Sequence, residues 1–431
     1  MTSFLDEMAA LLGEADARRL LEALQAPSRK SVNWLPGLAE GTSPIPWCPD
    51  TGRWWLADEL PGRTLHYTLG HYYIQEASAM LAAEAARLAQ PLAGLRVLDL
   101  CAAPGGKATQ LAAHATGGLL VANEVIRGRV DALRWNLTRH RLPNTVTVSL
   151  PTERLAAMLP GWFDVVMVDA PCSGEGLFAR RKHRVQDWSR KQVEVCARRQ
   201  ASILSNARAL LRPGGLLVYA TCTFSREEDE DRTAALLDAG MLPVDFPPLP
   251  ELSPALSPRE DVQRCSRRIW PHVQWAAGAY ACLLRAPDGP QPPQPRMATH
   301  QSKRWARMLN ADEPPLSLPE DTCLWRTGDV LRASTLPQLP QCLAQADVGL
   351  PVLHAGKAPQ WLHGCARWPS APRLLPLEEA QARAYARGED LRLPTSDGWW
   401  LPAWQGEALG LAKASRERLA NHLPKPLRVM G

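Results

Sequence analysis

The feature that most constrains this chain of 431 residues is an alternation of short apolar runs with longer amphipathic segments between residues 95 and 285. This alternation is typical of an α/β domain whose helices cover a parallel sheet. The runs predicted as strands, with a shorter candidate near Ile269, are Arg96–Leu100, Leu119–Asn123, Thr145–Ser149, Phe163–Asp169, Leu216–Thr221 and Ala279–Arg285. The segments predicted as helices are Lys107–Ala115, Arg127–Arg141, Ser189–Leu211 and Ser225–Ala239.

The segments on either side have different patterns. Residues Ser3 to Ala26 have apolar side chains at helical spacing, and Asp6 follows Ser3 as in a capping box. Residues 27–69 are rich in Pro, Gly and Trp and predict short strands and turns, whereas a helix is expected from about Gln75 to Leu88. The Pro-rich stretch Ala286 to Pro295 predicts a stiff linker, beyond which mixed short strands and helices are expected.

Composition narrows the class of protein. Hydrophobic residues make up 45% of the chain and charged residues 22%, which predicts a folded protein of about three domains. The net charge of +5 permits contact with a polyanion but identifies no partner. We find no run of about 18 apolar residues and no secretory signal, so we expect a cytoplasmic protein that is not attached to a membrane.

The ten cysteines are scattered, with no Cys-x-x-Cys pair and no histidine placed to complete a zinc site. We therefore expect reduced thiols and no metal. Seven cysteines are interpreted as small buried hydrophobic residues: Cys48, Cys196, Cys265, Cys282, Cys323, Cys342 and Cys365.

A candidate ligand loop follows the first predicted strand of the α/β domain. From Val97 to Lys107 an apolar strand leads into small residues and glycines and then into a helix, a geometry that brings a ligand against backbone N–H groups. Glu124 follows the next strand, where a carboxylate can hold the hydroxyls of an adenosine ribose. The loop is neither Gly-x-Gly-x-x-Gly nor a triphosphate loop, which disfavours NAD and ATP. Taken alone, Gly105 and Gly106 are equally compatible with a tight turn, and Glu124 with a solvated strand end.

Two cysteines follow the ends of other predicted strands. Cys172 lies in the segment Asp169 to Gly176, and Cys222 lies in the segment Tyr219 to Phe224. Open α/β proteins bind their ligands at the carboxyl ends of the strands. We therefore expect both thiols and Asp169 to face one crevice.

The segments Cys101–Lys107, Asp169–Gly176 and Thr221–Phe224 together resemble the RNA cytosine-5 methyltransferases of the Nol/Nop/Sun family, most closely the bacterial branch that acts on 16S ribosomal RNA. The resemblance extends from the N-terminal helix through Tyr72–Glu76 to the terminal Pro-Lys-Pro-Leu-Arg. It implies a Rossmann-like class I methyltransferase domain with a small N-terminal α/β unit and a C-terminal PUA-like mixed α+β RNA-binding module. The expected parts are an N-terminal RNA-contacting unit, the methyltransferase domain, a linker and a PUA-like region, at residues 1–75, 76–285, 286–298 and 299–431.

The resemblance also implies a cofactor and roles for individual residues. S-adenosylmethionine is the implied cofactor, and the residues implied for its site are Cys101, Ala102, Ala103, Pro104, Gly105, Gly106, Lys107, Glu124 and Asp169. Cys101 is expected only to line the loop. In this family the thiol at Cys222 attacks C6 of the base, the thiol at Cys172 assists release, and Asp169 binds the N3 and amine edge of the flipped cytosine. The expected partner is ribosomal RNA or the small ribosomal subunit, bound by a monomer.

The sequence departs from the family pattern at several positions. The aspartate that contacts the adenine in the family falls at Pro151. The family's Arg-Lys-Asp-Pro reads Arg181-Lys182-His183-Arg184 in this chain, and the matching Lys182 is expected either to contact RNA or to lie on a solvated charged face. Ala220 and Ala77 replace a serine and a proline, and both changes look tolerable.

Two other functions remain open at this point. One is a transfer-RNA cytosine-5 methyltransferase, which would share every catalytic residue. The other is an RNA-binding ribosome assembly factor with weak or no catalysis. Retention of both cysteines, Asp169 and Lys107 argues against the assembly factor, whereas Pro151 mildly favours it.

Overall fold

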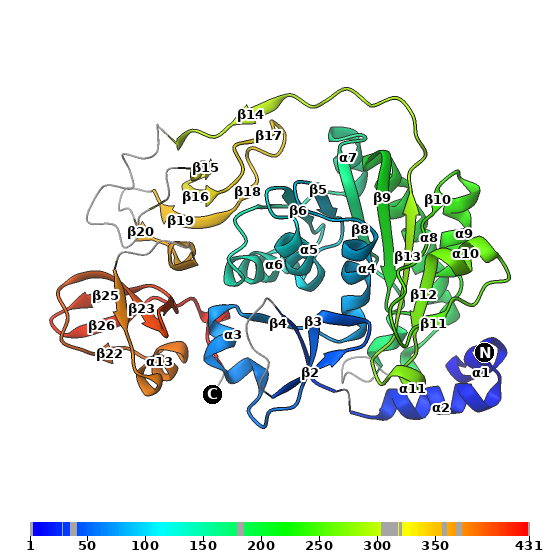
Figure 1. Cartoon of the computed structure of the whole chain (residues 1–431), viewed down its shortest axis with the longest axis horizontal. Helices are drawn as coiled ribbons and strands as arrows, with labels where there is room; N and C mark the ends of the chain where they lie inside the picture. The colour runs from blue at the N-terminus through cyan, green and yellow to red at the C-terminus, as the bar shows by residue number, and fades with distance from the viewer. Residues whose placement is uncertain are drawn as a thin grey trace.

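The computed structural model describes residues 3–27, 29–34, 41–178, 185–302, 318, 321–355, 360–367 and 373–429. A mixed β-sheet with helices on both faces forms the centre of the molecule (Figure 1). The N-terminal helices and a small sheet lie along one end of it, and the C-terminal β-rich parts lie on the side away from the N-terminus.

The central sheet has the strand order β11-β12-β13-β9-β8-β5-β6-β7-β18, with β10 paired to β13. Its strands are β5 (Arg96–Asp99), β6 (Leu119–Asn123), β7 (Thr145–Val148), β8 (Phe163–Asp169), β9 (Leu211–Thr221), β10 (Leu242–Pro243), β11 (Ser253–Pro254), β12 (Ser266–Ile269), β13 (Ala279–Arg285) and β18 (Asp347–Val348). Strands β5 to β9 pair in parallel, whereas β13 and β18 pair antiparallel to β9 and β7. The prediction of a parallel sheet was therefore wrong at both edges, because an apolar run indicates a strand but not its direction.

Helices cover the two faces of this sheet and close two hydrophobic cores. One face carries α4 (Leu81–Ala89), α5 (Gly106–His114) and α6 (Arg127–Arg139), and the other carries α7 (Thr152–Met158), α8 (Arg190–Leu210), α9 (Glu230–Asp238) and α10 (Glu260–Cys265). Successive strand residues serve opposite cores: Leu216 packs under α4 and α5, and Leu217 packs under α7 and α8. The near-continuous apolar strands that the sequence shows follow from this double burial.

The N-terminal part combines two helices with a small sheet of order β2-β3-β1-β4. Its elements are α1 (Phe4–Leu12), α2 (Glu14–Gln25), β1 (Ser31–Trp34), β2 (Thr42–Ile45), β3 (Cys48–Trp55), η1 (Pro61–Arg63), α3 (Leu65–Leu69) and β4 (Tyr72–Ile74). The capping box of Ser3 and Asp6 is confirmed. Gly13, at φ +86°, separates the two helices.

The helix expected from Gln75 begins later than predicted. A 3₁₀ turn η2 (Ser78–Met80) precedes α4, which starts at Leu81. The reason is tertiary: β4 pairs with β1, and the Gln75 N–H donates to the Ser31 carbonyl at 3.2 Å. The expected start of the helix was therefore wrong, because this backbone is already engaged in the small sheet.

Beyond the Pro-rich stretch the chain forms two further β-rich parts. Their elements are β14 (Met297–Thr299), β15 (Cys323–Thr327), β16 (Val330–Ser334), β17 (Gln338–Pro340), β19 (Leu350–His354), β20 (Gln360–Trp361), η5 (His363–Arg367), β21 (Leu374–Pro376), α13 (Glu379–Ala386), β22 (Leu391–Arg392), β23 (Gly398–Trp404), β24 (Glu407–Ala408), β25 (Ala412–Ser415), β26 (Arg418–Asn421) and η6 (Lys425–Leu427). The first part shares the core under β7: Trp325, Leu339 and Leu343 are buried there together with Val146. The second part packs its own core against Leu65 and Leu69 of α3.

All ten cysteines are free thiols. Six of the seven expected to be core residues are buried, but Cys342 is exposed, so its interpretation as a buried hydrophobic residue was wrong. Cys342 follows β17 in a turn, a position that the local sequence does not reveal. Within the part of the chain that the structure describes, no helix is long and apolar enough to cross a membrane.

Candidate active site

A cavity of about 1070 Å³ lies at the carboxyl ends of β5, β6, β8 and β9. Its lining includes nearly every residue that the sequence predicts for the site: Cys101, Ala102, Ala103, Pro104, Gly106, Lys107, Glu124, Asp169, Cys172 and Cys222. Gly105 is the exception and lies behind the loop, at the N-cap of α5. The sheet thus brings the predicted ligand loop and both thiols into one cavity.

The ligand loop is held by side chains of α6. Asn136 Nδ2 donates to the Pro104 carbonyl at 2.8 Å, and the guanidinium of Arg129 donates to the Ala103 carbonyl at 2.5 Å. Gly105 has φ +116°, a backbone conformation that side chains with a Cβ rarely adopt, and it starts α5. The loop is therefore held in place by hydrogen bonds from α6 and leads directly into α5, so it is more than a turn between two elements.

Asp99, at the end of β5, is a site residue that the sequence interpretation missed. Its side chain is buried, and neither carboxylate oxygen has a hydrogen-bond partner in the described part of the chain. Burial, together with the charge of Asp169, raises the pKa of Asp99 to about 7, although Lys107 and the Cys101 N–H act in the opposite direction. A buried carboxylate that lines a cavity without a partner is suited to a positively charged ligand.

Glu124 is only 3% exposed, which rules out a solvated strand end. Its Oε1 accepts a hydrogen bond from the Ile126 N–H at 2.9 Å. Its Oε2 lies 3.1 Å from the Arg129 guanidinium but accepts no hydrogen bond within the described residues. The carboxylate is therefore oriented by its neighbours and retains acceptor capacity toward the cavity.

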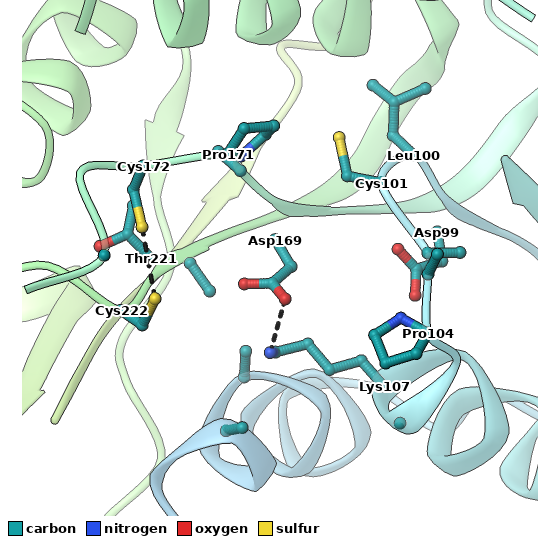
Figure 2. A pocket seen from close by; sticks show the side chains of 18 of the residues that line it. Asp99, Leu100, Cys101, Pro104, Lys107, Asp169, Pro171, Cys172, Thr221 and Cys222 are labelled. Carbon is teal, nitrogen blue, oxygen red and sulfur yellow. Dashed lines mark hydrogen bonds and ion pairs between the residues drawn. The ribbon is translucent and has the colours of Figure 1, made fainter. Parts of the chain in front are cut away.

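Lys107 and Asp169 form an ion pair in the middle of the cavity wall, with Nζ and Oδ2 2.8 Å apart (Figure 2). Burial would lower the pKa of Lys107, but Asp169 outweighs it and the pKa is raised. The negative charge of a Cys222 thiolate would raise that pKa further, so the ammonium lies near this thiol. The sequence places Lys107 in the ligand loop; the structure directs its side chain to Asp169.

The thiols of Cys172 and Cys222 meet across two loops. Their Sγ atoms are 3.4 Å apart, and the two side chains point toward one another to one side of Asp169 (Figure 2). The contact with Cys222 and burial raise the pKa of Cys172 well above its ordinary value. Cys172 therefore keeps its proton, and its S–H can donate toward Cys222.

A set of buried contacts joins the two cysteine loops. The Gly176 N–H donates to the Cys222 carbonyl at 2.8 Å, and the Ser173 and Thr223 hydroxyl oxygens are 2.6 Å apart. A Cβ at Gly176 would lie 2.9 Å from the same carbonyl oxygen, so only glycine fits. Glu175 accepts hydrogen bonds from the Phe224 N–H at 2.7 Å and from the Thr223 hydroxyl at 2.8 Å.

A second buried carboxylate, Glu228, also serves these loops. It accepts hydrogen bonds from the Ser173 N–H at 3.0 Å and from Gln200 Nε2 at 2.8 Å, and burial raises its pKa to about 7. Sequence interpretation missed both Glu175 and Glu228. Their position beside the two cysteine motifs was the only signal in the sequence. It was not sufficient, because acidic side chains are ordinarily expected to be exposed to water.

The end of the N-terminal unit and the segment that follows it supply one wall of the cavity, through Tyr73 to Glu76, Ser78 and Ala79. This wall is tied to the segment before β13, because Glu76 Oε1 accepts from the Ala277 N–H at 2.8 Å and the Ser78 hydroxyl donates to the Gly278 carbonyl at 3.0 Å. Pro151 also lines the cavity. The stretch Arg181 to Arg184 lies outside the described residues.

The fold and this cavity define a Rossmann-like methyltransferase that uses S-adenosylmethionine. The family described as 16S rRNA methyltransferase RsmB/F matches residues 86–285. The N-terminal domain of 16S rRNA methyltransferase RsmF matches residues 2–77, and the methyltransferase RsmF PUA domain matches residues 372–429.

Whole-chain relatives agree with these matches. The chain is 30% identical to ribosomal RNA small subunit methyltransferase F of Erwinia tasmaniensis, over 99% of this chain and 96% of that protein. It is 32% identical to the protein of the same name from Salmonella arizonae, over 94% and 86%. The chain therefore belongs to the RsmB/F family of 16S rRNA methyltransferases.

Solved structures show the same fold. A methyltransferase homolog protein from Pyrococcus horikoshii is 26% identical, with a TM-score of 0.56 over 65% of this chain and 93% of that one. NSun6 from the same organism, solved with SFG, has a TM-score of 0.56 over 67% of this chain and 99% of that one at 19% identity, and supports the fold alone.

The cavity fits the cofactor of this class. S-adenosylmethionine carries positive charge on its sulfonium and amino groups, and the buried carboxylate of Asp99 accepts no hydrogen bond in the described part of the chain. The acceptor capacity of Glu124 suits ribose hydroxyls. The small side chains from Cys101 to Gly106 leave room against the loop, where a Cβ at Gly106 would already press on Gln75 at 3.1 Å.

Proposed function

We propose that this protein methylates C5 of a cytosine in 16S ribosomal RNA through a covalent adduct with Cys222. The observation that carries the proposal is the contact of Cys222 with Cys172 in the cavity that also contains the Cys101–Lys107 loop. C5 of cytosine is a poor nucleophile, so direct transfer to it is slow without prior activation of the ring. A thiol placed beside the methyl-donor site supplies that activation.

Cys222 acts as the nucleophile in this proposal. Its thiolate forms a bond to C6, and the electrons of the C5–C6 double bond move into the ring and make C5 nucleophilic. S-adenosylmethionine, when bound, supplies an electrophilic methyl group. The Lys107 ammonium beside Cys222 favours negative charge at this end of the cavity.

Cys172 acts in release. After C5 has been methylated, solvent water takes its remaining proton, the electrons of the C5–H bond re-form the C5–C6 double bond, and the S–C6 bond breaks to return the Cys222 thiolate. Cys172 carries a proton and lies 3.4 Å from Cys222, so it can donate a hydrogen bond to the departing sulfur. The two thiols therefore have different tasks although they contact each other.

Asp169 recognises the base. The carboxylate lines the cavity next to both thiols and is held at 2.8 Å by Lys107. Hydrogen bonds from the amine and a protonated N3 to this carboxylate would stabilise the electron-rich adduct and select cytosine over uracil. The cofactor would be held by the Cys101–Lys107 loop, Glu124 and Asp99, with Asp169 at the border of the two sites.

The remaining parts bind RNA in this proposal. A PUA domain at residues 372–429 and an N-terminal unit whose last residues line the cavity offer surfaces for RNA. We propose domain limits at residues 1–75, 76–285, 286–298 and 299–431, a monomer, and the cytoplasm as the site of action. One chain holds both thiols and the cofactor loop, and the proposed substrate is ribosomal RNA or the small subunit.

Bisulfite sequencing of ribosomal and transfer RNA, from cells with and without this protein, tests the proposal. One or more cytosines of 16S RNA should lose protection when the protein is absent and regain it with the wild-type chain but not with Cys222→Ser. Loss of protection in transfer RNA instead would support the alternative substrate. Unchanged protection everywhere would support an assembly factor, which the intact thiol pair and Lys107–Asp169 pair argue against.

A further inference from the structure

Among the residues that the structure describes, Trp275 is an aromatic side chain with an unusually large exposed surface, 69% of it accessible. It follows α11 (Pro271–Gln274) with φ +57° and ψ 31°, in the left-handed region. Glycine adopts this conformation freely, whereas a tryptophan there is strained. Because most of its side chain stays in water, Trp275 contributes little hydrophobic stabilisation to the fold, and packing alone does not explain a tryptophan at this position.

Arg29 lies beside Trp275. Its guanidinium carbon is 5.5 Å from the centre of the Trp275 ring and 5.8 Å from the ring of Trp54, which is buried. Arg29 and its neighbour Lys30 are both exposed. The N-terminal unit thus contributes positive charge next to an accessible aromatic face.

A short segment of chain connects Trp275 to the wall of the catalytic cavity. Ala277, two residues after Trp275, lines the cavity and is anchored to Glu76, and Gly278 is anchored to Ser78. In the fold, α11 packs on α2 at the end of the central sheet that faces the small sheet (Figure 1). The aromatic ring of Trp275 is thus only two residues along the chain from the cavity wall. An RNA strand that places a nucleotide in the cavity would pass close to this ring.

We propose that Trp275 and Arg29 form a stacking site for an unpaired base next to the target cytosine. The inference rests on the proposed function, because a flipped target leaves its neighbour without a stacking partner. An aromatic face with an adjacent guanidinium is the combination that binds unpaired bases and the phosphate that follows them. The ligand is thus single-stranded RNA that flanks the methylated nucleotide.

Substitution of Trp275 tests the site without threatening the fold. Trp275→Gly relieves the strained backbone, so its melting temperature should equal or exceed that of the wild type. Its KM for small-subunit RNA should rise roughly ten-fold, with kcat and the affinity for S-adenosylmethionine unchanged. Trp275→Phe should retain most of the binding. Val273→Ala, which removes a 51% exposed apolar side chain from α11 just before Trp275, is the matched control and should behave as wild type.

A second measurement locates the base. RNA substrates are prepared with an abasic residue at single positions around the target. At one of these positions, the missing base should weaken RNA binding by the wild type about as much as Trp275→Gly weakens binding of the intact RNA. Trp275→Gly should bind the RNA that is abasic at that position as well as it binds the intact RNA. Equal RNA binding by the wild type and Trp275→Gly would overturn the stacking site. If the wild type methylates no RNA, the proposed function fails, and filter binding of small-subunit RNA to the two proteins still decides the stacking site.

Discussion

The Sγ atoms of Cys172 and Cys222 lie 3.4 Å apart although 50 positions separate the residues in the chain. The contact arises because β8 and β9 pair in parallel, with Asp169 opposite Ala220, so the loops after both strands begin at the same level. Both thiols can therefore reach one base, and substitutions distinguish their roles.

We expect Cys222→Ser to abolish methylation and to form no covalent complex, because an alcohol stays protonated near neutral pH and does not add to C6. Cys172→Ala should still form the adduct with the base, and the base should still receive the methyl group, but the variant should release RNA slowly. A denaturing gel of enzyme mixed with RNA should then show a crosslinked species for Cys172→Ala alone.

The double variant is the control for this pair. Cys172→Ala combined with Cys222→Ser should show no crosslink, because the bond runs through Cys222. A crosslink in Cys222→Ser but not in Cys172→Ala would reverse the two roles. Methylation that survives both substitutions would exclude covalent catalysis.

Asp99→Asn should stabilise the protein while weakening its binding of S-adenosylmethionine. The pKa of Asp99 is raised to about 7 from an ordinary 3.8, so the folded chain retains a proton that the unfolded chain releases, and stability falls as pH rises through this window. The stabilisation by Asp99→Asn should therefore be about 2 to 3 kcal/mol larger at pH 8 than at pH 5. Urea denaturation at both pH values and calorimetry with the cofactor measure the two effects; a gain independent of pH would contradict the assignment.

Glu124→Ala should weaken cofactor binding by about 1.5 to 3 kcal/mol, the range for a hydrogen bond to a charged group. The buried carboxylate is oriented by Ile126 and Arg129 and has acceptor capacity for the ribose. Isothermal calorimetry on the folded variant measures the loss. Asp131→Ala, an exposed acid on α6, is the control and should bind as wild type does. Unchanged affinity in Glu124→Ala would remove this residue from the site.

Two truncations should behave differently. Removal of the chain after Pro290 strips Trp325, Leu339 and Leu343 from the core they share with Val146, and we expect a marked loss of thermal stability. Removal after Arg367 leaves that core intact but takes Leu401 and Leu411 out of a smaller core that they share with Leu331, so we expect a smaller loss of stability. The protein truncated after Arg367 should still bind the cofactor. Its RNA affinity should be weaker and more dependent on salt, because the contacts of the PUA domain are lost while phosphate contacts remain. If the protein truncated after Arg367 methylates RNA with full efficiency, the PUA domain does not contribute to binding of this RNA and has another role.

Pro151→Asp should be tolerated. Pro151 is the N-cap of α7, where no side chain accepts a hydrogen bond from the first turn. An aspartate there can cap the helix and should be about 0.5 to 2 kcal/mol more stable than the control Pro151→Ala. Cofactor affinity should stay the same or tighten, because the new carboxylate also borders the cavity. A clear loss of affinity would show that the loop requires proline.

Local pattern was enough to locate most elements of the central domain. The predicted strands at Leu119, Phe163 and Ala279 have the observed bounds, because a doubly buried strand must be apolar along its whole length. Helices α5, α6 and α8 lie within two residues of their predicted limits. The later start of α9, at Glu230 and not Ser225, reflects tertiary contacts of the preceding backbone: the Ser225 N–H donates to the Thr223 hydroxyl, and the Glu228 carbonyl accepts from the Tyr219 hydroxyl.

The sequence by itself determined where the strands end and which chemically active side chains follow them: the loop from Cys101, the carboxylates of Glu124 and Asp169, and the two thiols. These are local properties of apolar runs and the residues that terminate them. Tertiary structure alone decided that Asp99 has no partner in the described chain, that Lys107 turns to Asp169, and that Glu175 and Glu228 are buried beneath the cysteine loops. Burial and pairing depend on which distant segments cover a side chain, and no local pattern contains that information.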